Sequence, residues 1–180
     1  MYQQVENVVP EEFRTLVKQE LLDSTAFPWY LMNKTLPDQN DPNDHPYLSH
    51  VLMHRNGDNN EGTINSMLIQ EFLPIFASVT DQLGLSVKHI MRANINLTWH
   101  NPWQHGAPHK DHECDHHNMI IYLNEFTQGG TYLFDNDNQI LDCAPAIPYG
   151  ATVFGGGKHA QGFCSPGELR LISVFTFQTH

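Results

Sequence analysis

Residues 105–124, HGAPHKDHECDHHNMIIYLN, combine five histidines, three acidic residues and a cysteine with a short apolar run. The apolar part is typical of a buried β-strand. The polar part holds a His-x-Asp at His109 and Asp111, and residues i and i+2 of an extended segment point to the same side. An imidazole and a carboxylate can therefore reach one metal ion together.

A third ligand must come from elsewhere in the chain, and His159 is the best candidate. It follows the apolar strand ATVF and the flexible GGGK, so it lies at a strand end after a tight turn. Two histidines and a carboxylate on one face of a metal, with other positions open, form the site of non-haem Fe(II) oxygenases. A lone His-x-Asp also occurs by chance, so the combination with His159 carries the interpretation.

The chain changes from helical to strand periodicity near Gly84. Apolar residues share one face over 10–22 and 64–83, which predicts two helices, and HIMRANINLTWH predicts a half-buried strand. Further strands are predicted over 118–124, 130–135, 139–143, 151–154 and 169–177. We therefore expect an α+β fold: a double-stranded β-helix, or jelly roll, over 89–177, with mostly helical support and loops over 1–88.

Composition narrows the class of protein. The 180 residues fit a single domain, and 40% apolar against 16% charged residues indicate a globular chain. A formal charge of −11, with nine scattered lysines and arginines, argues against nucleic-acid binding. No apolar run approaches the ~20 residues that cross a bilayer. Three irregularly spaced cysteines and a start without a secretory pattern lead us to expect a cytoplasmic protein.

The second half of the chain resembles the 2-oxoglutarate/Fe(II)-dependent dioxygenases. The resemblance rests on His109-x-Asp111, IIYLNEFTQGGTYLFD, PYGATVF, His159 and Arg170, and covers about residues 90–177. It is similar above all to the prolyl-4-hydroxylase-like branch, which includes small stand-alone enzymes of bacteriophages. A phage-encoded chain would work in the host cytoplasm.

The resemblance implies roles for the metal ligands and for one arginine. His109, Asp111 and His159 match the family's iron ligands and act in catalysis through the iron. Arg170 matches the basic residue that pairs with the distal carboxylate of 2-oxoglutarate, and its planar fork suits a carboxylate.

Two further residues are implied as co-substrate contacts. Tyr122 matches a tyrosine that donates its hydroxyl to the same carboxylate, although a core aromatic is the other interpretation. Many relatives have Ser or Thr two residues after the arginine, where this chain has Ile172, followed by Ser173. Ser173 can take that role only if the strand carries a bulge.

The implied reaction uses Fe(II), 2-oxoglutarate and O₂, hydroxylates a C–H bond, and releases succinate and CO₂, with ascorbate in a supporting role. The branch favours a peptidyl proline, but the fold serves many targets, so small molecules remain open. A cupin-type metal enzyme without 2-oxoglutarate and a non-catalytic jelly-roll binding protein are the alternatives. The hydroxylated position and the oligomeric state are not readable from the sequence.

Other polar residues surround the predicted ligands: His105, His112, Cys114, His116 and His117. Their spacing fits no zinc site, and we interpret them as a mobile loop after the ligands that faces the substrate. The acidic stretch DQNDPNDHP, residues 38–46, fits either a lid or a solvated loop.

Overall fold

The computed structural model describes residues 1–35 and 41–180. The helices are α1 (Glu11–Leu16), its π-helical continuation η1 (Val17–Leu22), and α2 (Ile69–Gln82). The strands are β1 (Tyr2–Val5), β2 (Tyr30–Met32), β3 (Tyr47–His54), β4 (Thr63–Ile64), β5 (Val87–Trp99), β6 (His117–Tyr122), β7 (Thr131–Phe134), β8 (Ile140–Ala144), β9 (Ala151–Gly155), β10 (His159–Gln161) and β11 (Leu169–Thr179). None of the helices in these residues has the length and apolar character needed to cross a bilayer.

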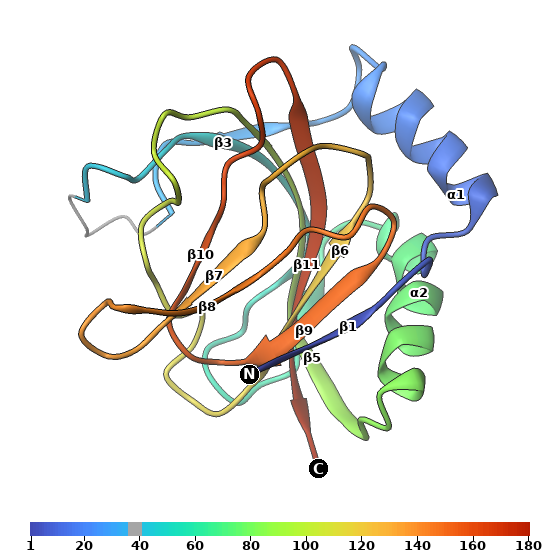
Figure 1. Ribbon diagram of the computed structural model, residues 1–180. Coiled ribbons are helices and arrows are strands. Elements are labelled where there is room, and N and C mark those ends of the chain that lie inside the picture. The colour runs from blue at the N-terminus through green and yellow to red at the C-terminus, as the bar shows by residue number, and fades with distance from the viewer. Residues whose placement is uncertain (36–40) are drawn as a thin grey trace.

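The strands form two antiparallel sheets. The larger sheet has the order β1-β9-β6-β11-β5-β3-β2, with β4 beside β3, and the smaller has the order β10-β7-β8. The helices lie together on one side of the larger sheet, and the smaller sheet lies on the other (Figure 1). This arrangement confirms the α+β class and the jelly roll expected from the sequence.

The main core fills the space between the helices and the larger sheet. Phe13 of α1 packs edge-on against Phe72 of α2, with ring centroids 5.0 Å apart. Phe76 of α2 lies 4.9 Å from Phe175 and 5.1 Å from Phe177, both on β11. Because side chains alternate along a strand, these β11 residues face the helices while their neighbours face the smaller sheet.

A second apolar cluster lies on the opposite face of the larger sheet. Ile120 of β6 and Ile172 and Val174 of β11 pack there with Leu133 of β7 and Phe154 of β9. This cluster joins the two sheets at one end and leaves a pocket between them.

The first half of the chain contributes more to the sheet than the sequence predicts. β1 pairs with β9, and β3 pairs with β5, so residues expected as support and loops belong to the jelly roll itself. A register shift between Val51 and Met53 explains the missed β3, because a bulge breaks the alternation by which a strand is recognised.

The second helix is shorter than predicted. Residues 64–83 were expected to be helical, but α2 begins at Ile69, because the segment before it is fastened to β3. The backbone N–H groups of Asn65 and Ser66 both donate to the Leu52 carbonyl oxygen, at 2.9 and 3.1 Å. That turn sets the point at which the helix can start.

Replacing Phe72 with alanine should test this packing. Phe72 is fully buried, so Phe72→Ala should lower the free energy of unfolding by about 3–5 kcal/mol in urea titrations. Tyr30→Ala is the matched control, since Tyr30 is 61% exposed and its loss should change stability by less than about 0.5 kcal/mol. Equal effects of the two substitutions would contradict the assigned core.

Candidate metal centre

The structure brings the three predicted metal ligands together. His109 and Asp111 lie in the connection between β5 and β6, and His159 is the first residue of β10. The backbones of the two histidines pair, each N–H donating to the other's carbonyl oxygen at 2.9 Å. Potential ligand atoms of the three side chains all lie within 4.8 Å of one another. In the described part of the chain, no other group of three such residues has this geometry.

Backbone carbonyls fix which ring nitrogen of each histidine is free. Nδ1 of His109 donates to the Ala107 carbonyl at 3.0 Å, and Nδ1 of His159 donates to the Gly157 carbonyl at 3.1 Å. With the hydrogen on Nδ1, Nε2 keeps its lone pair for a metal. Burial lowers the pKa of His109 to about 4, so its imidazole is neutral at pH 7.

Arg92 of β5 binds one oxygen of the Asp111 carboxylate and leaves the other oxygen free. Its Nη2 donates to Asp111 Oδ1 at 2.8 Å. Burial alone would raise the pKa of Asp111, but the charge of Arg92 and contacts with His159 hold it well below its usual value. Oδ2 of this carboxylate lies 3.3 Å from His159 Nε2 and makes no hydrogen bond. Two facing electron-pair donors of this kind fit a shared metal cation.

Arg170 is a buried cation that has no acidic partner among the described residues. It lies on β11 and is 1% exposed. Its Nε donates to the Gly129 carbonyl at 2.7 Å, while Nη1 has no partner in the described structure. No acidic side chain of the described residues forms an ion pair with it. Burial lowers the pKa of Arg170, but a guanidinium keeps its proton, so the site calls for an anionic ligand.

Two buried hydroxyls accompany this guanidinium. Tyr122 is fully buried on β6, and the guanidinium carbon of Arg170 lies 5.9 Å from its ring centroid. The hydroxyl of Tyr122 and that of Thr131 on β7 are both buried without a hydrogen-bond partner in the described residues. Thr131 was not recognised from the sequence, where it looks like an ordinary strand residue.

A pocket of about 820 Å³ lies beside the metal ligands. The three metal ligands, Thr131 and Arg170 all line it. In this acidic chain, five of the nine lysines and arginines line it too: Arg55, Arg92, Lys110, Lys158 and Arg170. Four acidic residues line it as well: Asp41, Asp58, Asp111 and Glu113. Because Arg170 forms no ion pair with an acidic side chain of the described residues, its charge is the one that a small anion in the pocket can meet.

Ser173 lies away from this pocket. The register of β11 against β5 and β6 is unbroken from Leu169 to Thr176, so the strand has no bulge near Arg170. Ser173 consequently faces the opposite side, where its hydroxyl donates to the Asn94 carbonyl at 3.2 Å. Ile172 takes the pocket-facing position.

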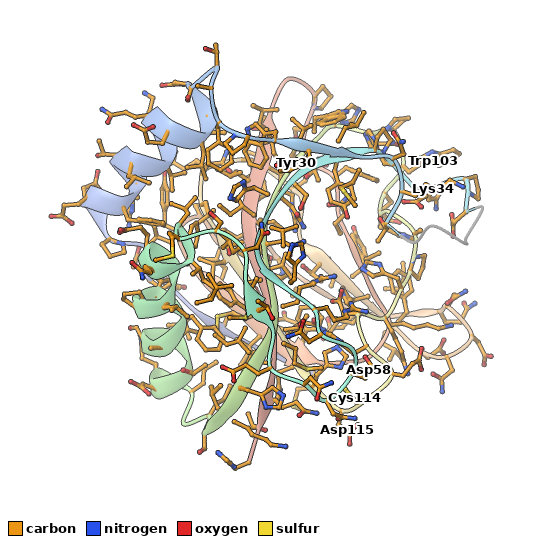
Figure 2. The ribbon with its side chains drawn as sticks, turned by 180° about the vertical axis from the view of Figure 1, so that it is seen from behind. Tyr30, Lys34, Asp58, Trp103, Cys114 and Asp115 are labelled. Carbon is orange, nitrogen blue, oxygen red and sulfur yellow. The ribbon has the colours of Figure 1, made fainter. Side chains whose placement is uncertain are left out.

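Two of the histidines after the ligands, His112 and His116, are buried and hydrogen-bonded. His112 is buried; its Nδ1 donates to Asp58 at 3.2 Å and its Nε2 accepts from Thr176 at 2.8 Å. Buried His116 lies beside it, with ring centroids 4.8 Å apart, and donates to the Cys114 carbonyl. Figure 2 shows Asp58 close to Cys114 from behind. These contacts join the ligand segment to the β3–β4 loop, and a mobile loop that faces the substrate stays a prediction.

The outer histidines and the acidic stretch have separate places. His105 packs 5.3 Å from Tyr132, and His117 stacks on Phe177 at 5.4 Å, both measured between ring centroids. Of the acidic stretch 38–46, residues 38–40 lie outside the described residues. Asp41 lines the pocket. Both interpretations of this stretch, a lid and a solvated loop, stay predictions.

The sequence also gave no sign of the role of Arg92. It belongs to the polar face of β5. The alternation of side chains predicts that Arg92 lies on this face, but it does not predict which residues face it. In the structure that side faces the pocket and not bulk solvent, and Arg92 and Asn94 both line it.

Comparison with solved structures identifies the fold. The chain is similar to a 2OG-Fe(II) oxygenase family oxidoreductase from Burkholderia pseudomallei, with TM-score 0.71 and 11% identity over 99% of this chain and 85% of that one. It is similar to the alpha-ketoglutarate-dependent epimerase SnoN from nogalamycin biosynthesis, with TM-score 0.66 and 12% identity over 98% and 77%. It is also similar to a Trichoplax adhaerens prolyl hydroxylase bound to a hypoxia-inducible-factor peptide, with TM-score 0.63 and 14% identity over 98% and 83%. No protein-family model and no curated protein matches the chain.

These similarities define the class of fold: the jelly roll of the 2-oxoglutarate/Fe(II) oxygenases. They agree with the resemblance recognised in the sequence. At this level of identity they establish the architecture, while the chemistry rests on the residues of the pocket.

Replacing Arg92 should weaken metal binding without unfolding the protein. Arg92→Met removes the hydrogen bond that orients Asp111, and such supporting contacts contribute about 10- to 100-fold to metal affinity. Calorimetric titration with Mn(II) measures the effect, with exposed Lys88→Met as the control of equal charge change. An Arg92→Met affinity equal to that of Lys88→Met would show that Arg92 does not orient the ligand.

Proposed function

We propose that the protein is a 2-oxoglutarate- and Fe(II)-dependent oxygenase whose single domain spans residues 1–180. The observation that carries this proposal is Arg170, a buried guanidinium without an acidic partner among the described residues. It shares a pocket with two histidines and a carboxylate placed to bind a metal. A dicarboxylate that reaches from the metal to Arg170 satisfies both ends of that pocket.

Each residue has a defined task in this proposal. His109, Asp111 and His159 hold Fe(II), and Arg92 leaves only Asp111 Oδ2 for the metal. Fe(II) with 2-oxoglutarate and O₂ supplies the oxidation that turns the co-substrate into succinate and CO₂ and hydroxylates a C–H bond.

The remaining contacts bind and shield the co-substrate. Arg170 binds its distal carboxylate through paired N–H groups, and the unpaired hydroxyls of Tyr122 and Thr131 add donors. The apolar side chains of Ile120, Ile172 and Val174 line the same pocket and keep water from the reacting atoms.

The finer proposal is hydroxylation of a peptidyl proline, with ascorbate as a supporting reductant. The similar prolyl hydroxylase bound to a peptide supports a protein segment as substrate. The similar epimerase shows that the fold also serves other reactions. All three cysteines of the chain are free, which fits the reducing cytoplasm.

Arg170 also separates this proposal from the two alternatives. A cupin-type enzyme that uses no 2-oxoglutarate has no need of a buried guanidinium in its metal pocket. A binding protein without catalysis has no need of three metal-ligating side chains whose free atoms converge. The oxygenase uses both features.

Succinate formation tests the proposed reaction directly. Protein purified without oxygen and then given Fe(II), 2-oxoglutarate, ascorbate and O₂ should release succinate slowly even without its prime substrate. His109→Ala should abolish the product because it removes a metal ligand, whereas His54→Ala, at an exposed position outside the pocket, should not. Equal succinate from wild type and His109→Ala would contradict the metal assignment.

Co-substrate affinity tests Arg170 separately. Arg170→Met keeps the length and the apolar stem but removes the charge, and truncating one partner of a buried charged pair costs at least about 2 kcal/mol, or roughly 30-fold. Titrating 2-oxoglutarate into Fe(II)-loaded protein without oxygen, and following the visible charge-transfer band, gives the dissociation constant. Unchanged affinity would place the carboxylate elsewhere.

A further inference from the structure

A pair of asparagine side chains lines the pocket and has no task in the proposed reaction. Asn94 and Asn96 lie two residues apart on β5, so both face the pocket. Behind them lies Ser49 of β3, which is 2% exposed. Buried polar groups in such a cluster are costly unless every one is paired, and this cluster leaves some groups open.

The hydroxyl of Ser49 fixes how the two amides are turned. It donates to Asn96 Oδ1 at 2.7 Å and accepts from Asn94 Nδ2 at 3.4 Å. The single hydrogen of this hydroxyl goes to Asn96 Oδ1, so Asn94 can approach it only with its Nδ2 group. They therefore offer opposite ends to the pocket. Asn94 Oδ1 is buried and has no partner in the described residues, and it is free to accept.

Along β5 the pair lies between Arg92, which holds Asp111, and Thr98, which pairs with Arg170, and it is separated from Tyr122 by β11. In the larger sheet β11 separates β6, which carries Tyr122, from β5 and β3. Asn94 pairs across the sheet with Val174, and Arg92, two residues along β5, holds Asp111. The two amides thus line the β5 side of the pocket, across β11 from Tyr122.

We propose that Asn94 and Asn96 determine specificity by binding a secondary amide of the prime substrate. Asn94 Oδ1 accepts the N–H of that amide, and the Asn96 amide group donates to a carbonyl oxygen. This inference rests on the proposed function, because it places the prime substrate beside the iron site.

Other substrate chemistries fit the pair less well. A carboxylate would bring its charge against the acceptor of Asn94. A hydrocarbon would leave the buried acceptor of Asn94 unpaired. An amide supplies one donor and one acceptor, which is what the two side chains require. Its source is either a peptide segment or a small molecule that contains an amide.

Two probes that differ in one group test the proposal. N-acetylproline methylamide contains a single N–H, whereas N-acetylproline methyl ester has the same shape and none. Saturation-transfer NMR on protein loaded with Zn(II), which is diamagnetic, and 2-oxoglutarate gives their dissociation constants. Wild type should bind the methylamide about 3- to 10-fold more tightly than the ester, as expected for one hydrogen bond to a buried acceptor.

The variants assign that preference to the two side chains. Asn94→Leu should bind both probes equally, Asn94→Asp should keep the preference, and Asn96→Leu should weaken both probes together. Asn33→Leu, at an exposed position outside the pocket, should behave as wild type. A capped tetrapeptide with a central proline identifies the source: tighter binding than the methylamide indicates a peptide, and equal or weaker binding a small molecule.

Several results would overturn the proposal. These are equal affinity of wild type for both probes, no binding of either probe, or a preference that survives in Asn94→Leu. A loss of 2-oxoglutarate affinity in Asn94→Leu would instead assign the pair to the co-substrate. Wild type that binds neither Zn(II) nor 2-oxoglutarate would show that the proposed function itself has failed.

Discussion

The alternation of side chains along β11 is the constraint on which the rest of the structure depends. This central strand pairs with both β5 and β6, and its period of two gives each face a separate task. Leu171, Phe175 and Phe177 belong to the core with the helices, whereas Arg170 and Ile172 face the pocket side. A shift of one residue would bury the guanidinium among the phenylalanines and move the apolar core into the pocket.

The pocket holds polar groups that the protein alone does not satisfy. Arg170 Nη1, the hydroxyl of Thr131 and Asp111 Oδ2 are all buried and unpaired in the described structure, and the three residues line the pocket. Unpaired buried groups lower stability, so their gathering in one pocket is best explained by ligands that complete them. The same reasoning extends to Asn94, whose buried Oδ1 is also unpaired in the described structure. The main core against the helices supplies the stability that offsets these groups.

The sequence predicted the parts of the site that local periodicity controls. His109 and Asp111 follow from the spacing of an extended segment, and His159 follows from a strand end and a turn. Arg92 and Thr131 could not be predicted, because their roles depend on which strands meet across the pocket. The jelly roll and most of its strands were predictable from alternation, but β3 was hidden by its bulge. Ser173 faces away from Arg170 because β11 has no bulge near it, a feature that the sequence left open.

The central claim is that one dicarboxylate links the metal ligands to Arg170. A crystal structure of the protein grown without oxygen, with Mn(II) and 2-oxoglutarate, tests it most directly. The account predicts a metal bound by His109, Asp111 and His159, and a 2-oxoglutarate whose distal carboxylate contacts the Arg170 guanidinium. A metal bound at these residues with Arg170 occupied by another group, or with 2-oxoglutarate bound elsewhere, would contradict it.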